Sequence, residues 1–411
     1  MSDLPIGWSW KELRELASIV KGRKHDVRDD PSDGWLPYIG ASAMEGRVEF
    51  YAENARGAVV AQSSDVLMLW DGERSGFSAR GMDGVVGSTV ARLRPRPDVD
   101  AAFLHHQLVH SFGFIQKHRT GTGVPHVPQD LKTLLVLPIP SEVEQQMAIA
   151  EFLDRLDSQV AVLRDIALKL EHIREGVLSD LLALGADGVA SASTTSPDWQ
   201  DAPWGRMPGH WLVNTLESMS ARVTVGVVNA ATHAYVEEGV PFVRSQNVRP
   251  NAFDTGGMLY VSESYNRSKA KSILRSGDVV IVRTGYPGTA AVVPPWLDGA
   301  NCFSLLIVTP GPDLSPEYLA HFLNSPIGRR EVKKTHFGSA QHNLNVAELK
   351  QFVIAVPPIS EQLSIVNTLA QLDERIGNAW ERMAKASMIR LGIMRDTLGS
   401  GPRPLLEGSG A

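Results

Sequence analysis

The chain has 411 residues, of which 43% are hydrophobic, and a formal net charge of −6, which together exclude a disordered chain and a uniformly basic nucleic-acid-binding protein. The single cysteine, Cys302, excludes an internal disulfide and a cysteine-based zinc cluster, and its apolar neighbours predict a small core residue. No apolar run approaches the roughly 18 residues of a spanning helix and no signal peptide is visible at the start, so we expect a cytoplasmic protein with no membrane segment.

Residues 1–140 form the first mixed segment, in which short β-branched runs alternate with glycine and proline. An amphipathic helix is predicted over residues 103–116, and the segment ends at Pro138 and Pro140. The helix carries His105, His106 and His110, at spacings that can present a metal pair. No carboxylate or thiol completes a ligand set, so packing or surface histidines are the favoured interpretation, and no metal site is predicted.

Residues 141–184 are helical by their periodicity, with large apolar residues recurring every seven positions. Residues 185–206 are rich in Gly, Ala, Ser and Thr and predict a flexible linker in which no element need form. The net negative charge is concentrated in these two stretches, whereas the mixed segments are nearly neutral. A phosphate-binding face can therefore still arise from Lys and Arg gathered on one side of a mixed segment.

Residues 207–358 form the second mixed segment, with strands predicted over residues 279–284 and 305–310 and a short helix over residues 316–323. After Pro357 and Pro358 the helical period returns in residues 359–411. Leucines of the first helix and alanines of the second are complementary in size, so the two helices are expected to pair as a coiled coil. The alternative is that each packs only on its own mixed segment. The predicted seam consists of Leu156, Leu163, Leu170, Val177, Leu372, Ala379, Ala386 and Ile393.

Almost every feature of the first half returns in the same order about 210 residues later. The strand-like DVLMLWDG (residues 65–72) is answered by DVVIVRTG (278–285), and the tail IREGVLSDLL (173–182) by IRLGIMRDTL (389–398). This period is far longer than the roughly 20 to 50 residues of solenoid repeats. The chain is therefore predicted to contain two similar units of domain size.

Catalytic motifs are missing from the sequence. It has no Gly-Lys-Ser/Thr phosphate loop, no Asn-Pro-Pro-aromatic strand end and no His-Glu-x-x-His helix. Asp65 and Asp278 occupy equivalent positions and could form a carboxylate pair, but Asp after Ser or Gly at a strand entrance is more typical of a turn. The glycine loops at residues 121–123 and 338–340 are consistent either with contact to a DNA backbone or with plain tight loops.

The layout resembles the specificity subunits of Type I restriction-modification systems over nearly the whole chain. Three repeated features carry the resemblance: the start at Gly7–Trp8 and His210–Trp211, the junction after the proline stops, and the Gly-aliphatic-aliphatic-x-Asp-x-Leu tail. At the junction, QQMAIAEFLDRLD (residues 145–157) lies opposite EQLSIVNTLAQLD (361–373). Gln145 stands where the second copy has Glu361, a departure that affects the helix register and not the family.

The resemblance implies an α+β fold in which two mixed α/β target-recognition domains are joined by two long conserved helices that pair as an antiparallel coiled coil, with a pseudo-twofold internal repeat. The expected segments are residues 1–140 and 207–358 as recognition domains, 141–184 and 359–411 as helical spacers, and 185–206 as linker. Such a protein is a non-catalytic DNA-recognition subunit in host defence. The alternative is a tandem-repeat adaptor that binds protein or RNA.

The partners that the resemblance implies are double-stranded DNA, two methyltransferase subunits and, through these, restriction and translocase subunits. S-adenosylmethionine, ATP and Mg²⁺ are expected only in those partner subunits and no cofactor is expected in this chain. Base contact depends on a few loop side chains, and a solvated surface role is the alternative for each. The candidates for DNA contact, chosen at strand ends and glycine-rich loops, are Arg23, Lys24, Arg74, Arg80, Arg244, Gln246, Asn247 and Arg283.

Overall fold

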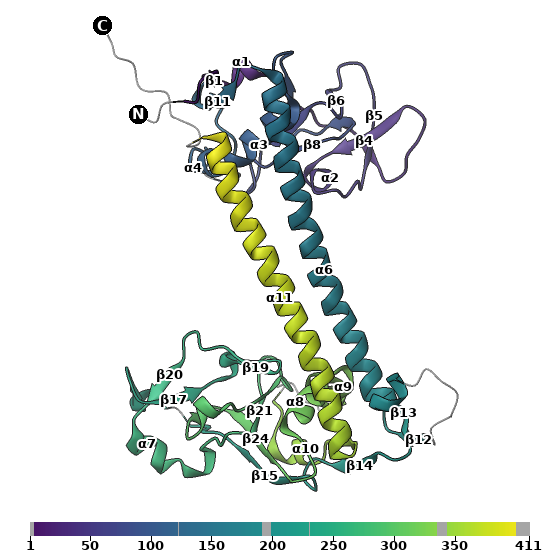
Figure 1. Ribbon diagram of the computed structural model, residues 1–411, viewed down its shortest axis with the longest axis vertical. Coiled ribbons are helices and arrows are strands. Elements are labelled where there is room, and N and C mark those ends of the chain that lie inside the picture. Colours follow the sequence, from purple (N-terminus) through teal and green to yellow (C-terminus); the bar gives the residue numbers. More distant parts are fainter. Residues whose placement is uncertain (1–3, 122, 191–198, 230, 335–342, 400–411) are drawn as a thin grey trace. The chain divides into compact units, whose positions relative to one another are not determined.

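The structure is a computed structural model that describes residues 4–121, 123–190, 199–229, 231–334 and 343–399. The chain divides into two units: unit 1 comprises residues 1–165 and 379–411, and unit 2 comprises residues 166–378. Two long helices, α6 (Val143–Ala190) and α11 (Ile359–Leu398), each contribute one part to each unit (Figure 1).

Unit 1 is built on an antiparallel sheet with the strand order β2-β10-β7-β8. Its strand β7 has the sequence VLML and is buried throughout, as expected for a continuous aliphatic run covered on both faces. Helices α3 and α4 pack on one face, where Phe103 and Leu108 share a core with Val66 and Met68. The bounds are β2 Ala17–Lys21, β7 Val66–Leu69, β8 Ser78–Arg80, β10 Val90–Pro95, α3 Ala101–His110 and α4 Phe112–Lys117.

A second sheet of unit 1, with the order β3-β5-β4-β9-β6, contains one parallel pair, in which Tyr38 of β4 lies opposite Val85 of β9. The first strand, β1, pairs with the last, β11, and thereby joins the two ends of the segment. The remaining bounds are β1 Trp8–Glu12, β3 Val27–Arg28, β4 Trp35–Ile39, β5 Tyr51–Glu53, β6 Val60–Ala61, β9 Gly84–Val86, β11 Val136–Pro140, α1 Leu13–Leu16, α2 Ala41–Met44 and α5 Leu131–Leu134.

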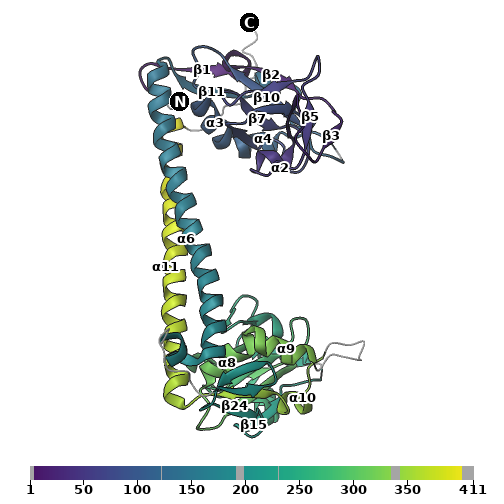
Figure 2. The ribbon, with the colours of Figure 1, turned by 90° about the vertical axis from the view of Figure 1, so that its right-hand side faces the viewer.

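Unit 2 contains a sheet with the corresponding order, β15-β24-β21-β22, and helices α8 and α9 cover it (Figure 2). Its strand β21 has the sequence VVIV and is again buried throughout. Strands β14 and β25 pair as β1 and β11 do, and β17 and β23 form the parallel pair. The bounds are β14 Leu212–Thr215, β15 Ser220–Val225, β17 Val240–Val243, β21 Val279–Val282, β22 Ala290–Val292, β23 Asn301–Cys302, β24 Leu305–Pro310, β25 Val353–Val356, α8 Pro316–Asn324 and α9 Pro326–Lys334.

Unit 2 also contains several smaller elements. Strand β17 also belongs to the sheet β16-β20-β17-β23, and β18 and β19 form a separate hairpin. The bounds are β16 Tyr235–Val236, β18 Val248–Arg249, β19 Ala252–Phe253, β20 Leu259–Val261, α7 Glu263–Ser268, α10 Val346–Lys350, and the short 3₁₀ turns η1 Thr232–Ala234, η2 Ser245–Asn247, η3 Ala270–Ser272 and η4 Pro295–Leu297.

The strands predicted over residues 279–284 and 305–310 are confirmed as β21 and β24, and the helix predicted over residues 316–323 is α8. The helix predicted over residues 103–116 is instead two helices, which end and begin at Ser111. The Ser111 N–H still donates to the Gln107 carbonyl at 2.9 Å, and the buried Ser111 hydroxyl donates to the same carbonyl at 2.7 Å, a bond of the kind that bends helices.

The linker prediction for residues 185–206 needs correction at both ends. Helix α6 continues to Ala190, and a hairpin forms from β12 (Trp199–Ala202) and β13 (Gly205–Pro208). The hairpin is stabilised because Met207 is fully buried in the core of unit 2 and the Gln200 amide donates to the Pro208 carbonyl at 3.1 Å. Residues 191–198 lie outside the described residues, as do 338–340 of the second glycine loop and 400–411 of the second helical spacer.

A buried glutamine ties the start of each long helix to its unit. In unit 1 the Gln146 Oε1 accepts from the Asp100 backbone N–H at 2.8 Å, while its Nε2 donates to the Asp98 and Pro140 carbonyls. Gln362 repeats this pattern in unit 2, accepting from Ser315 N–H at 2.8 Å and donating to the carbonyls of Asp313 and Pro357. Both side chains are fully buried. The proline and glutamine of the repeated junction thus have a structural reason: they fix each helix against its mixed segment.

Replacing Gln362 by methionine is expected to lower the stability of the protein by about 2 kcal/mol or more, since two buried backbone groups and one partly buried group lose their partner and each buried unsatisfied group contributes about 1 kcal/mol or more. The measurement is the melting temperature of the purified chain. Gln371→Met on the same helix is the matched control, because the Gln371 side chain is exposed. Equal melting temperatures for the two variants would contradict this role of Gln362.

The two long helices are joined by ion pairs at equivalent points of the repeat. In unit 1 Arg390 of α11 binds Asp157 of α6, with Nη2 and Oδ2 3.0 Å apart. In unit 2 Arg174 of α6 binds Asp373 of α11, again with Nη2 and Oδ2 at 3.0 Å. The predicted seam residues are all buried or half-buried: Leu156, Leu163, Leu170, Val177, Leu372, Ala379, Ala386 and Ile393. Among the described residues, no helix is long and apolar enough to cross a membrane.

Candidate nucleic-acid interface

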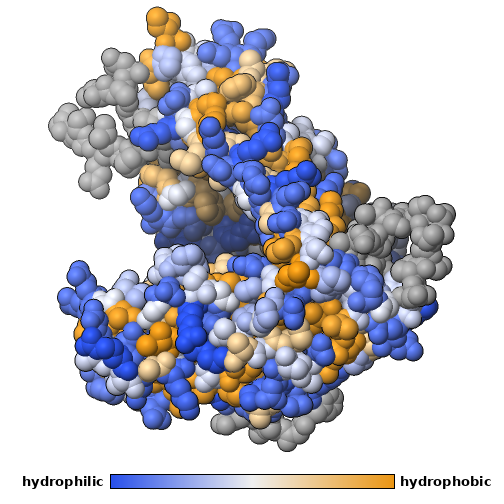
Figure 3. All heavy atoms as spheres, turned by 60° about the horizontal axis from the view of Figure 1, so that its bottom comes forward, coloured by the Kyte–Doolittle hydropathy of each residue, from blue (hydrophilic) through white to orange (hydrophobic). Residues whose placement is uncertain are grey.

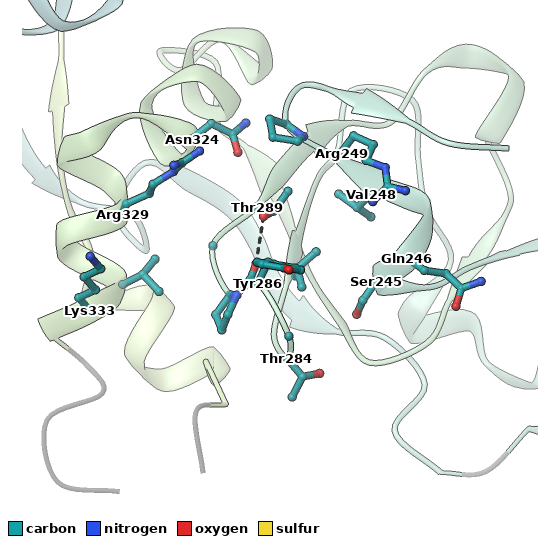
Figure 4. Close-up of a pocket in the computed structure, with 16 residues that line it drawn as sticks. Ser245, Gln246, Val248, Arg249, Thr284, Tyr286, Thr289, Asn324, Arg329 and Lys333 are labelled. Carbon is teal, nitrogen blue, oxygen red and sulfur yellow. Dashed lines mark hydrogen bonds between the residues drawn. The ribbon is translucent and has the colours of Figure 1, made fainter. Parts of the chain in front are cut away.

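A groove opens on unit 2 between three elements: the turn after β21, the segment around β18, and helix α9 (Figure 4). It encloses a cavity of about 880 Å³. Arg329 and Lys333 lie on one wall, Gln246 and Arg249 on the opposite wall, and Tyr286 between them (Figure 4). The groove is therefore assembled from residues that are distant in the sequence.

The groove is electropositive. Arg329 and Lys333 are exposed, lie one helical turn apart on α9, and have no acidic partner within salt-bridge distance among the described residues. Arg249 on the other wall binds Asp254 at 2.9 Å. None of the described residues that line the cavity is acidic. Cations that are not neutralised by neighbouring acids attract phosphate, so the α9 wall of the groove suits a nucleic-acid backbone.

The turn that carries Tyr286 is held in one conformation. Gly285 and Gly288 have φ of 87° and 91°, which is the left-handed region that favours glycine. The Gly288 N–H donates to the Val282 carbonyl at 3.0 Å, and the Thr289 hydroxyl donates to the Tyr286 carbonyl at 3.0 Å. A Cβ at Gly288 would lie 2.6 Å from Val332 of α9, so only glycine allows the turn to approach the helix. This contact sets Tyr286 beside the α9 cations.

Of the residues predicted in unit 2, Gln246 is exposed and lines the groove. Arg244 is half-buried and its Nη2 donates to the Gly257 carbonyl at 2.6 Å. Arg283 is also half-buried, and its Nε donates to the Leu344 carbonyl at 3.0 Å. Asn247 is fully buried, and its amide donates to the Asp254 carbonyl at 3.0 Å. With no exposed surface, Asn247 shapes the loop that presents Gln246 and Arg249.

Unit 1 has the corresponding turn over residues 71–77, with different chemistry. Gly76 has φ of 94°, and a Cβ there would lie 2.7 Å from Ile115 of α4. The turn of unit 1 thus approaches its helix as closely as the Gly288 turn approaches Val332 in unit 2. Arg74 is exposed, lies over the Phe77 ring at 4.4 Å and binds Glu45.

Of the other residues predicted in unit 1, two are exposed and one binds a carboxylate. Arg23 and Lys24 are exposed beyond the end of β2. Arg80 is half-buried and binds Asp154 of α6 at 2.5 Å, and the same carboxylate contacts His106 Nε2 at 2.8 Å. Burial opposes ionisation of Asp154, but the hydrogen bonds from Arg80 and His106 outweigh it and lower the pKa of the carboxyl. Arg80 thus connects the sheet to α6.

The equivalent carboxylates Asp65 and Asp278 are structural. Each closes a turn: Asp65 accepts from Gln62 N–H and Asp278 from Arg275 N–H, both at 2.9 Å, as the turn interpretation predicts. Asp65 also binds Arg94 of β10 through both oxygens at 2.8 Å, and Asp278 binds Arg222 of β15 at 2.5 Å. Burial raises the pKa of Asp65, but the hydrogen bonds from Arg94 and Gln62 outweigh it, so the pKa is lowered.

The remaining titratable candidates are core groups. Cys302 is fully buried, as predicted, and burial raises the pKa of its thiol to about 12. Burial lowers the pKa of His105 and of His321 to about 4, so both are neutral at pH 7. Within the described ranges, no three His, Cys, Asp or Glu side chains come together as a metal-binding group.

Sequence reasoning missed four residues of the groove: Arg249, Tyr286, Arg329 and Lys333. Two signals for them were present. The pattern Thr-Gly-Tyr-Pro-Gly (residues 284–288) places an aromatic residue between glycines at a tight turn, and Arg329 and Lys333 have the i, i+4 spacing of one helix face. What the sequence did not show is that the two segments meet.

The comparisons with known proteins identify the family. The family described as Type I restriction modification DNA specificity domain matches residues 5–172 and 231–382, which is more than half of the chain. The chain belongs to this family. It is similar to the Type I restriction enzyme MjaVIII specificity subunit of Methanocaldococcus jannaschii (21% identity, covering 91% of this chain and 88% of the relative) and to the EcoKI specificity subunit of Escherichia coli strain K12 (25% identity, 92% and 86%).

Solved structures agree on the fold. The S subunit of a Type I restriction-modification system from M. genitalium matches with a TM-score of 0.58 at 15% identity, covering 97% of this chain and 98% of that chain. A chain from a type I R-M system, solved to explain complex assembly and conformational transition, matches with a TM-score of 0.60 at 18% identity, covering 97% and 99%. The family predicted from the repeated motifs is confirmed: this is a non-catalytic, sequence-recognising DNA specificity subunit, and none of these matches favours the adaptor alternative.

Proposed function

We propose that each unit reads one half of a bipartite site in duplex DNA, and that α6 and α11 form an antiparallel coiled coil that sets the distance between the half-sites. The groove of unit 2 carries this proposal, because the α9 cations Arg329 and Lys333, which have no acidic partner among the described residues, line it together with an exposed aromatic side chain on the turn that recurs in unit 1. We take residues 1–140 and 207–358 as the two recognition domains, 141–184 and 359–411 as the helical spacers, and 185–206 as the connection. Because the units are similar but not identical, a pseudo-twofold protein can read a non-palindromic site.

In this proposal the DNA contacts come from the exposed cations and amides. In unit 2, Arg329 and Lys333 bind phosphates, and Gln246 and Arg249 reach base edges, with Arg244 and Arg283 supporting the rim. In unit 1 the set consists of Arg23, Lys24 and Arg74, with Arg80 engaged at α6. The difference between the two sets would make the half-sites differ in sequence.

Apolar side chains exposed on the long helices support the recruitment of two methyltransferase subunits. Met147 on α6 and Leu363 on α11 are 54% and 50% exposed, and they stand at equivalent points of the repeat. Ile173 and Ile389, 52% and 49% exposed, form the second equivalent pair. Apolar side chains reach the surface among hydrophilic ones (Figure 3). Met147 and Ile389 belong to unit 1 and Leu363 and Ile173 to unit 2, so the chain offers two similar docking areas.

The chemistry of the complex would belong to the partners. S-adenosylmethionine would bind the methyltransferase subunits, which methylate the site that this chain selects, while ATP and Mg²⁺ would serve the restriction and translocase subunits. In this chain the residues bind and orient DNA.

Exchanging residues 207–358 for the same segment of a relative is expected to change one half of the methylated motif and leave the other half intact. The reason is that this segment holds the whole groove of unit 2 and none of the turn of unit 1. The measurement is methylome sequencing of cells that express the chain with its methyltransferase partner. Exchange of residues 1–140 is the matched control and should change the other half. A motif that changes in both halves after either exchange would refute modular recognition.

A further inference from the structure

Tyr286 is an exposed aromatic side chain that does not contribute to a hydrophobic core. It is 84% exposed, the highest value of any aromatic side chain among the described residues. Exposure of a large apolar ring on a soluble protein is common for single residues, but here it coincides with a groove that is lined by cations. The ring therefore stands where a ligand of the groove would meet it.

The backbone that carries the ring is held in one conformation. Tyr286 is followed by Pro287, whose ring fixes its own φ, and is flanked by Gly285 and Gly288, both with positive φ. The Thr289 hydroxyl holds the Tyr286 carbonyl at 3.0 Å, and Gly288 lies against α9 (Figure 4). A backbone fixed in this way places an aromatic side chain in advance, so little conformational entropy is lost when the ring binds.

The positive charges around the ring indicate a ligand that carries phosphates. Arg329 and Lys333 lie on one side of Tyr286 and Arg249 lies on the other (Figure 4). When phosphates of a duplex are bound on both walls, the base stack passes between them, over the ring. A flat apolar ring with a polar hydroxyl at its edge matches a base step, in which it can stack on an unstacked base.

The first unit offers no such ring. The turn of unit 1 has one more residue between its glycines, so Tyr286 corresponds to Glu73 when counted from Gly72 and to Arg74 when counted from Gly76. The Glu73 side chain is 88% exposed and is repelled by phosphates, and Arg74 binds Glu45. The two half-sites are therefore bound differently.

We propose that Tyr286 is a wedge that inserts its ring into a base step of the half-site read by unit 2 and partly unstacks it, whereas unit 1 leaves its half-site stacked. This inference rests on the proposed function, namely that unit 2 binds one half of the DNA site. It adds a sequence preference that needs no hydrogen bond to a base, because pyrimidine–purine steps unstack more readily than other steps.

The test uses the full chain in complex with its methyltransferase subunits and a duplex that contains the motif found by methylome sequencing. A fluorescent base analogue replaces each base of the two half-sites in turn, and the adenine that is methylated and its neighbours stay unlabelled. We expect enhanced fluorescence at one step of the unit 2 half-site, retained in Tyr286→Phe and lost in Tyr286→Ala. Tyr286→Ala should also bind the duplex about 10-fold more weakly, since stacking on an aromatic ring contributes this much per base.

Glu73→Ala is the matched control at the equivalent turn, and it should leave the fluorescence at the unit 2 half-site unchanged. If the wild-type complex binds the duplex but no labelled step brightens, and Tyr286→Ala binds as tightly as wild type, the wedge is refuted while DNA recognition stands. If Tyr286→Phe behaves like Tyr286→Ala, the hydroxyl and not the ring is responsible, and stacking is refuted. If the wild-type complex does not bind its motif duplex, the proposed function itself fails.

Discussion

Reversing the two charges of α9 that line the groove, by Arg329→Glu together with Lys333→Glu, is expected to abolish methylation of the motif in cells. Both side chains are exposed, one turn apart on a wall of the groove. Each phosphate contact contributes about 0.9 to the slope of log K against log salt concentration, and the double change replaces two attractions by two repulsions. A loss of duplex affinity of about 100-fold or more at physiological salt, with a salt slope reduced by about 2, is the expected result.

The matched control is Lys271→Glu with Arg275→Glu. It alters the net charge by the same amount, and both residues are exposed in unit 2 but do not line the groove. Affinity measured at several salt concentrations separates the two variants: a local effect weakens only the α9 variant, whereas a general effect of net charge weakens both equally. The second outcome would remove the groove from the proposed DNA-binding surface. Circular dichroism checks that each variant is folded.

Adding seven residues to each long helix, after Leu163 and after Ala379, should lengthen the gap of the methylated motif while leaving both half-sites unchanged. The two insertion points are equivalent in the repeat, and a heptad keeps the apolar positions of both helices in register. Seven residues add about 10 Å of helix at roughly 1.5 Å each. At about 3.4 Å per base pair this corresponds to roughly three base pairs.

Methylome sequencing shows the gap directly. An active variant whose gap is unchanged would mean that the helices do not set the spacing. The matched control adds the heptad to α6 alone, which shifts part of α6 relative to α11, so that the pairs Arg390–Asp157 and Arg174–Asp373 cannot both form. We expect that variant to melt at a lower temperature and to lose methylation.

The sequence predicted the elements whose signals are local and repeated. The aliphatic runs of β7 and β21 are strands, and the periodic stretches after the proline stops are the long helices α6 and α11. The helix break at Ser111 was not predicted, because its buried hydroxyl adds a second bond to the Gln107 carbonyl and no periodicity reveals such a bond. The hairpin at Trp199 was missed for a related reason: composition indicated a linker, and the tertiary burial of Met207 overrides it.

The proposed DNA-binding surface was harder to predict, because its residues converge only in the fold. Asn247 was chosen for its polar amide, which turns inward and holds its own loop. Arg80 was chosen for its place near a glycine-rich loop, and a carboxylate from α6 binds it. Arg329 and Lys333 were passed over because they follow a helix start far from any strand end, yet Gly288 brings the β21 turn against that helix.

The way in which the long helices are shared affects how the protein can be made. Unit 2 uses one uninterrupted stretch of chain, residues 166–378, whereas the core of unit 1 includes Met394 and Leu398 beside Leu153. A ribosome releases all of unit 2 before it releases the last helical turns that unit 1 needs. Unit 1, whose synthesis begins first, is therefore completed last. A nascent chain that stops before residue 379 leaves an apolar face of unit 1 exposed to chaperones or to aggregation.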